Sequence, residues 1–521
     1  MIDELEELDH TDAGQLDRKT VVGELRGSLK QSTTRGVLFS TGGQIISFLF
    51  RTVSMVILAR LLFPKDFGLL GMVTAATGFI GLFRDAGLSL AAIQRDTLTK
   101  GQVYTLFWVN FGVGCFLAAS SALIAPVLVN FYHEPRLYWI TVTLGLAFVL
   151  QGASAQHRAI LQRKMRFQAL AVIDTVSWAG SITLAIGMAA TGWGYWALVG
   201  MTLGQTALNS CGTWLVDGWL PRAPGSLTEI FSMLRFGGAV SLNTVFSYLA
   251  YNTDKILLGR FWGAATLGIY GRAYQLANLP VENLNSTLAL VAFPALARLQ
   301  NDPARLKNYF LKGYRLFLSL SIPLTVSFAL FAEEIILVFL GPRWREAVPI
   351  FRLLSPTITA FGLINPLFWL LLATGQIRRS LKMGLVVTPL IICGYSVGLS
   401  RGPSGVAVSF SITMICVAAP LILFWAQHGP QGTVVKWKDL MDCMLPPVVA
   451  AAGAAVATIA LQTLFTHALP VFFRLPAALT LFFSVYLLIL LGAMKQLALF
   501  RSVLQEIGLS RLYRLRGSQP F

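Results

Sequence analysis

Charge is scarce in this sequence. Only 12% of its 521 residues are Asp, Glu, Lys or Arg, whereas 55% are apolar. A water-soluble protein of this length would not have enough polar side chains to cover its surface. The composition therefore excludes an ordinary soluble domain and makes lipid part of the solvent.

Cysteines and enzyme motifs are scarce as well. The five cysteines lie in or beside apolar stretches without C-x-x-C spacing, so they indicate neither a disulfide framework nor a zinc site. No G-x-S-x-G, P-loop or H-E-x-x-H motif occurs. We therefore expect a protein that is not an enzyme and needs no metal or cofactor. A membrane glycan polymerase or ligase remains the enzyme alternative, because Glu333, Glu334, Arg343 and Arg345 lie in or beside one expected periplasmic loop.

Two features of soluble or secreted proteins are also missing. The net charge is +17, but the basic residues lie in short segments and form no stripe with interleaved aromatic residues, so nucleic acid is not an expected partner. Residues 1–17 are rich in acids where a signal peptide would need a basic start and an apolar run. We expect that tail to be disordered and cytoplasmic.

Long apolar runs are what the sequence does have. Stretches of about 20 residues, enough for a helix to cross a hydrocarbon core of about 30 Å, recur from residue 36 to residue 497. We expect an all-α membrane protein with about fourteen transmembrane helices. The expected spans are 36–62, 67–90, 102–130, 136–155, 169–190, 192–216, 231–258, 264–296, 313–340, 346–373, 379–399, 403–427, 440–465 and 470–497.

The basic residues give the expected orientation. The termini and the even-numbered loops together carry about four times as many Lys and Arg as the odd-numbered loops, which is the bias of cytoplasmic segments. We expect a multi-pass protein of a bacterial inner membrane with both termini in the cytoplasm.

A repeat appears when the chain is shifted by 200 residues. RLLFPKDFGLLG at 60–71 then lies over RFWGAATLGIYG at 260–271. The same shift places Gln44, Ser47, Arg51 and Ser54 over Thr244, Ser247, Tyr251 and Asp254. Because each set of four shares one helix face, both helices carry a polar stripe that must be hidden from lipid. Two parallel six-helix lobes facing each other across a central cavity would hide both stripes.

The repeat predicts the domain organisation. The segments are a cytoplasmic tail (1–35), an N-lobe (36–216), an interlobe linker (217–230), a C-lobe (231–427), an appended helix pair (440–497) and a basic cytoplasmic tail (498–521).

Two segments resemble a known family. ILARLLFPKDFGLLGM at 57–72 and NTDKILLGRFWGAATLGIYGRAYQLANLP at 252–280, with the 12-plus-2 helix count, resemble polysaccharide flippases of the Wzx type, in the WzxC and teichuronic-acid exporter branch. The resemblance implies membership of the multidrug/oligosaccharidyl-lipid/polysaccharide exporter superfamily. It implies movement of an undecaprenyl-pyrophosphate-linked glycan to the periplasmic leaflet for surface polysaccharide, with membrane lipid and other polysaccharide-assembly proteins as further partners.

Cations inside the expected spans are the candidate phosphate-binding groups. Arg51 lies about 24 Å along its helix from residue 35, too deep for easy snorkelling. It would bind pyrophosphate in a cavity, or form a structural ion pair, with Asp85 as the candidate partner. Arg84 is a second candidate, although Arg84 and Asp85 alternatively form an interfacial pair. Further candidates for substrate binding are Gln44, Ser47, Tyr251, Lys255 and Arg272.

Acids inside the spans are the candidate ion-coupling groups. Asp254 lies among amide and hydroxyl groups that suit a proton or Na⁺, or is neutralised internally by Lys255. Asp174 is a lone acid that acts in a proton relay or is a capped polar residue. Asp85 and Glu282 are the remaining candidates, and Pro280 predicts a kink for gating or plain packing.

The remaining expectations concern the membrane interface, the alternative transporter functions and the energy source. Trp214 and Trp219 are expected at membrane interfaces, and residues 157–168 as an amphipathic cytoplasmic connector. A drug/cation antiporter of the same superfamily would need an acidic cavity. A lipid II flippase would concentrate more cations in its N-lobe. We expect alternating access driven by an ion gradient.

Overall fold

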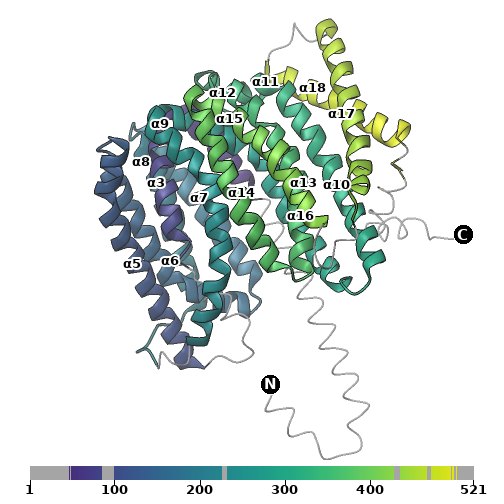
Figure 1. The fold of residues 1–521 in the computed structure, drawn as a ribbon. Helices are drawn as coiled ribbons and strands as arrows, with labels where there is room; N and C mark the ends of the chain where they lie inside the picture. Colours follow the sequence, from purple (N-terminus) through teal and green to yellow (C-terminus); the bar gives the residue numbers. More distant parts are fainter. Residues whose placement is uncertain are drawn as a thin grey trace, which may run out of the picture. The chain divides into compact units, whose positions relative to one another are not determined.

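The computed structural model describes most of the chain. Its described residues are 46, 48–84, 99–225, 231–427, 435–465, 471–494, 496, 497 and 500. Within these ranges the regular structure is helical and contains no strand, which confirms the all-α class (Figure 1).

The described helices match the expected spans one after another. Residues 48–61 are helical, and the other elements are α3 (Pro64–Gly81), α5 (Lys100–Tyr132), α6 (Leu137–Arg163), α7 (Phe167–Ala190), α8 (Tyr195–Asp217), α9 (Phe231–Arg298), α10 (Pro303–Leu330), α11 (Ala332–Phe339), η2 (Pro342–Trp344), α12 (Ala347–Leu354), α13 (Pro356–Ala373), α14 (Ile377–Gly398), η3 (Leu399–Arg401), α15 (Gly402–Ile412), η4 (Thr413–Ala418), α16 (Ala419–Gln427), α17 (Trp437–Phe465), α18 (Val471–Leu487) and η5 (Leu488–Ala493). In the described part, eight helical segments are long and apolar enough to cross a membrane. The chain is a multi-pass membrane protein.

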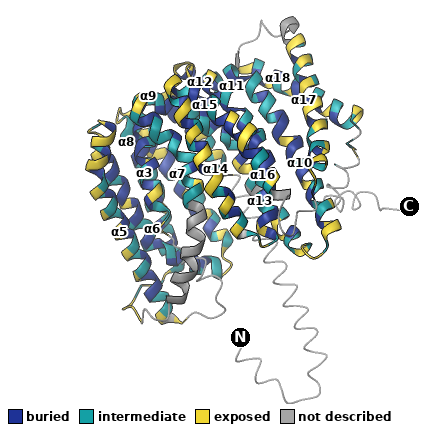
Figure 2. Cartoon of the chain, in the orientation of Figure 1, coloured by how far each residue is buried: buried dark blue, intermediate teal, exposed yellow. Residues whose placement is uncertain are grey.

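Apolar side chains cover the outside of these helices. Phe116, Leu123 and Val127 on α5 are exposed by 69%, 78% and 61%, and Leu445 and Val456 on α17 by 62% and 69% (Figure 2). Large apolar side chains in such numbers would be unstable in water but match the hydrocarbon of a bilayer.

The chain divides into two compact units, each described here by itself. The first comprises residues 1–58, 80–127 and 138–241, and the second comprises residues 59–79, 128–137 and 242–521. The lobe boundaries expected from the repeat stay a prediction.

Small residues let the helices of the first unit approach closely. A Cβ atom on Gly114 of α5 would lie 2.5 Å from the carbonyl oxygen of Phe148 on α6. A Cβ atom on Gly152 of α6 would lie 2.5 Å from the carbonyl oxygen of Asn110 on α5. Close backbone contact at small residues is the usual means of helix association in membranes, and it sets α5 and α6 side by side.

In the second unit, α9 changes direction at Gly263. This residue has φ 79° and ψ 177°, a combination that is essentially restricted to glycine, and it separates two helical arms. The expected spans 231–258 and 264–296 correspond to these arms.

Two glycines join α3 to the second arm of α9. A Cβ atom on Gly68 would lie 1.7 Å from the carbonyl oxygen of Ala264, and one on Gly268 would lie 1.8 Å from that of Pro64. Gly68 and Gly268, like Pro64 and Ala264, are matched by the 200-residue shift. The repeat therefore appears in the packing as a reciprocal contact.

Some helix ends differ from the expected boundaries. Helix α6 continues to Arg163, so residues 157–163 of the expected connector are helical and extend the span that was expected to end at residue 155. Helix α10 begins at Pro303, ten residues before the expected span, because the Asp302 side chain caps it by accepting a hydrogen bond from Arg305 N at 3.1 Å. Hydropathy marks the part of a helix in lipid and not the turns beyond it.

Candidate functional site

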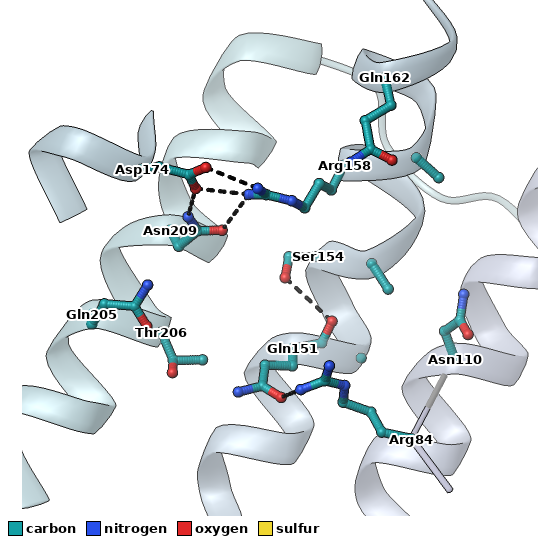
Figure 3. Close-up of a pocket in the computed structure, with 13 residues that line it drawn as sticks. Arg84, Asn110, Gln151, Ser154, Arg158, Gln162, Asp174, Gln205, Thr206 and Asn209 are labelled. Atoms are coloured by element: carbon teal, nitrogen blue, oxygen red, sulfur yellow. Dashed lines mark hydrogen bonds and ion pairs between the residues drawn. The ribbon is translucent and has the colours of Figure 1, made fainter. Parts of the chain in front are cut away.

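A polar cavity of about 430 Å³ lies within the first unit. Side chains from α5, α6, α7 and α8 line it, together with Arg84, which follows the end of α3 (Figure 3). The amides that line it are Asn110, Gln151, Gln162, Gln205 and Asn209. Amides donate and accept hydrogen bonds, so the lining suits a ligand rich in hydroxyl and phosphate oxygens.

Helix α6 contributes the largest share of this lining. Gln151, Ser154, Arg158 and Gln162 follow one another at spacings of three, four and four residues, which places them on one helix face. Figure 3 shows this row along the cavity. The polar face continues past residue 155, where the expected span ended, because the helix itself continues.

One end of the cavity holds a closed group of three side chains. Arg158 donates from Nη1 to Asp174 Oδ1 at 2.8 Å and from Nη2 to Asp174 Oδ2 at 2.9 Å. Asn209 donates from Nδ2 to Asp174 Oδ1 at 2.7 Å and accepts from Arg158 Nη1 at 3.3 Å. This bidentate pair neutralises both charges, and the amide fixes its geometry.

The other cation of the cavity has no ion pair within the described part of the chain. Arg84 donates from Nη1 to Gln151 Oε1, and among the described residues no carboxylate pairs with it. Figure 3 shows Arg84 and Gln151 away from the Arg158–Asp174 pair. The described cavity therefore has a neutral end and a positive end.

Asp174 and Arg84 thus lie in this cavity, and other predicted site residues lie elsewhere. Asp174 is not a lone acid, because Arg158, which was assigned to a cytoplasmic connector, reaches it from α6. Arg51 is exposed and its guanidinium lies 5.9 Å from the ring centre of Trp178 on α7. Gln44, Ser47 and Asp85 lie outside the described residues, so the Arg51–Asp85 alternative stays a prediction.

The predicted cluster in the first arm of α9 forms a network in the second unit. Asp254 is fully buried and accepts hydrogen bonds from the Tyr270 hydroxyl and from Lys255 N, both at 2.8 Å. The ammonium of Lys255 donates to Asn252 Oδ1 at 2.8 Å and to Tyr251 O at 3.3 Å. The two charged side chains therefore bond to different groups, although they are neighbours in sequence.

The predicted residues of the second arm of α9 also lie in the second unit. Arg272 donates to Gln275 Oε1 at 2.6 Å, and its guanidinium lies 4.1 Å from the ring centre of Phe67. Glu282 is exposed and accepts from Asn278 at 2.8 Å. Pro280 lies within the continuous helix, whose non-helical residue is Gly263 instead.

An aromatic cluster beside the cavity fixes the segment that follows α8. The His157 ring stacks on Trp214 and Trp219, with centres 4.4 and 4.5 Å apart. Trp108 donates from Nε1 to Arg222 O at 2.9 Å. Trp214 donates to Ala153 O at 2.9 Å, so this residue packs on α6 rather than serving only as an interfacial anchor.

The chain is similar in sequence to proteins of polysaccharide biosynthesis. The chain is 27% identical over 398 residues to the lipopolysaccharide biosynthesis protein WzxC of Escherichia coli (strain K12), covering 74% of this chain and 80% of that protein. It is 29% identical over 308 residues to the teichuronic acid biosynthesis protein TuaB of Bacillus subtilis (strain 168), covering 58% and 62%. These relatives confirm the resemblance seen in the sequence.

Solved structures share the fold. The lipid II flippase MurJ in an inward closed conformation matches with a TM-score of 0.69 at 15% identity, covering 89% of this chain and 100% of that chain. An inward-facing multidrug resistance MATE family transporter of the MOP superfamily matches with a TM-score of 0.55 at 15% identity, covering 73% and 93%. The chain shares the fold of these two proteins. A family described as "Polysaccharide biosynthesis protein" matches residues 57–349, and the chain belongs to this family.

Proposed function

We propose that this protein moves a polyprenyl-pyrophosphate-linked oligosaccharide from the cytoplasmic to the periplasmic leaflet of the inner membrane during synthesis of a surface polysaccharide. The observation that carries the proposal is the polar cavity of the first unit, with the guanidinium of Arg84, which pairs with no described carboxylate, at one end. Family membership supplies the context of polysaccharide synthesis.

The cavity's chemistry supports an anionic, sugar-bearing substrate. A guanidinium matches phosphate oxygens in charge and geometry, and it lies among amides that pair with sugar hydroxyls. A cationic drug would instead need a free carboxylate, whereas Asp174, the described acid of the cavity, is already bonded to Arg158. The antiporter alternative therefore has less support than the flippase.

The position of the lining residues along their helices also supports the proposal. Gln151 to Gln162 lie in the second half of α6, and Asn110 and Asp174 lie in the first halves of α5 and α7. The distribution of basic residues predicts that these helix ends lie on the cytoplasmic side. The cavity would then open where cytoplasmic enzymes assemble the lipid-linked glycan.

We propose an ion gradient as the energy source, acting through alternating access. Asp254 is the first candidate for the coupling site, because a fully buried carboxylate in a membrane helix is energetically costly and such residues usually serve a function. The hydroxyl of Tyr270 would hold its geometry in the ion-free state.

The experiment follows the glycan in cells. Deletion of the gene should cause a lipid-linked oligosaccharide to accumulate in the cytoplasmic leaflet. Expression of wild type or Arg345→Ala should remove the accumulated lipid-linked oligosaccharide, whereas Arg84→Ala should not. Arg84→Lys should remove part of it, because lysine keeps the charge but not the planar pair of donors. Arg345 is a matched control, since it forms an exposed pair with Glu333. Full clearance by Arg84→Ala at normal membrane abundance would refute the assignment of the cavity.

A further inference from the structure

We propose that Arg158, Asp174 and Asn209 form a sugar-reading subsite that takes the hydroxyl groups of an uncharged first sugar of the glycan. This inference rests on the proposed function, because it places the pyrophosphate at Arg84. The first sugar is bonded directly to the pyrophosphate. It must therefore extend from the Arg84 end of the cavity toward the Arg158 end (Figure 3), since Gln151 and Arg158 are seven residues, about 10 Å, apart along α6.

The hydrogen-bond capacity of the three side chains supports this assignment. A carboxylate can accept about four hydrogen bonds, and Asp174 accepts three from Arg158 and Asn209, which leaves one position on Oδ2. Asn209 retains a second N–H on Nδ2, and Arg158 retains donors on Nε and Nη2. The group thus offers one acceptor beside several donors.

Sugar hydroxyls need that combination. Each hydroxyl group both donates and accepts, so two neighbouring hydroxyls are best satisfied by an acceptor and a donor held side by side. The bonds between Asp174, Arg158 and Asn209 hold these groups in place before the sugar arrives, which reduces the cost of ordering them on binding.

The three side chains are accessible as well as ordered. The side chains of Arg158 and Asp174 are exposed by 37% and 32%, and they face the cavity (Figure 3). Gln205 lies one helical turn before Asn209 on α8 and lines the same wall. Its amide makes no hydrogen bond to the described residues, so it is available to the ligand.

The charge of the subsite selects against an acidic sugar. Asp174 neutralises Arg158, so a carboxylate on the sugar would find no free cation at this end and would lie close to the Asp174 carboxylate. The subsite therefore suits a neutral hexose or N-acetylhexosamine rather than a uronic acid.

The test measures binding of short-chain probes to the full-length protein in lipid nanodiscs. The probes are geranyl pyrophosphate alone and geranyl pyrophosphate carrying glucose, galactose, N-acetylglucosamine or glucuronic acid. Wild type should bind at least one neutral sugar probe about five-fold more tightly than geranyl pyrophosphate, the effect expected of one net hydrogen bond. Gln205→Ala and Asn209→Ala should remove most of this preference and leave the affinity for geranyl pyrophosphate unchanged.

The controls separate this inference from the proposed function. Arg84→Ala should weaken all probes equally, and Arg345→Ala should weaken none. Gln205→Ala leaves the bonds between Arg158, Asp174 and Asn209 intact, so it remains informative if Asn209→Ala unfolds. The sugar-reading subsite would be overturned if wild type bound the sugar probes and geranyl pyrophosphate with equal affinity, or bound the glucuronic acid probe more tightly than the neutral sugar probes. In either case, weaker binding of all probes by Arg84→Ala would still support the proposed function. Unchanged binding by Arg84→Ala would overturn the phosphate site instead.

Discussion

At the residue scale, the cavity joins side chains that are far apart in the chain. Arg158 on α6, Asp174 on α7 and Asn209 on α8 meet at 2.7 to 3.3 Å. Bidentate hydrogen bonds between a guanidinium and a carboxylate are stronger than hydrogen bonds between neutral groups. This pair therefore contributes to the stability of the first unit as well as to its chemistry.

A double-mutant cycle tests the pair. Asp174→Ala, Arg158→Ala and the double variant should give a coupling free energy of about 1–2 kcal/mol, because each single variant leaves a partner without its bidentate bond. The measurement is thermal unfolding of the purified protein in detergent. A coupling near zero would show that the two side chains are not bonded in the folded protein.

The sequence predicted some site residues and missed others for a physical reason. Charged groups such as Arg84, Asp174 and Asp254 stand out in apolar spans, because lipid penalises charge. Gln151 and Asn209 do not stand out, since an uncharged amide in a membrane helix is a weak signal. The helical spacing of Gln151, Arg158 and Gln162 was visible in the sequence, but the expected span ended before Arg158.

At the element scale, hydropathy predicted the helices better than their ends. Each expected span has a helical counterpart in the described chain, because about 20 apolar residues in lipid have few alternatives to a helix. The extension of α6 to Arg163 was not predicted, since turns outside the hydrocarbon can be polar. That extension carries Arg158 and Gln162, so the missed boundary also hid part of the site.

The contact between α3 and the second arm of α9 gives a prediction about packing. Gly68→Ala and Gly268→Ala should each destabilise the protein by about 3 kcal/mol, because the added methyl group would overlap a backbone carbonyl. Unfolding temperature and folded yield measure this effect. Gly271→Ala is the matched control, since no atom lies within 4 Å of its added Cβ.

The outcome at the control position decides the interpretation. If Gly271→Ala lowered stability as much as Gly68→Ala, helix propensity or lipid contact rather than close approach would be the cause. If Gly68→Ala were neutral, the two helices could not be in backbone contact.

The bend in α9 gives a second prediction at this scale. Gly263→Ala should cost about 1–3 kcal/mol, because a side chain is strained at this positive φ angle. Its added Cβ meets no atom within 4 Å, so the cost would be conformational and not steric. Thermal unfolding should show a lower transition temperature than in Gly271→Ala, and equal temperatures would contradict the bend.

At the scale of the whole molecule, the predicted orientation can be tested directly. The excess of basic residues predicts that both termini and the even-numbered loops lie in the cytoplasm. A reporter that is active only in the periplasm should be inactive when fused after residue 521 and active when fused in the loop around Gly192. The opposite pattern would place the cavity of the first unit toward the periplasm and contradict its assigned role.

The central claim is that this cavity binds the phosphate-linked headgroup of a lipid and carries it across the membrane. The direct measurement uses purified protein in liposomes with a fluorescent polyprenyl-pyrophosphoryl oligosaccharide, whose arrival in the other leaflet is followed by quenching. Wild type and Arg345→Ala should move the lipid well above the protein-free rate, and Arg84→Ala should fall to that rate. Transport by Arg84→Ala at the wild-type rate would contradict the account.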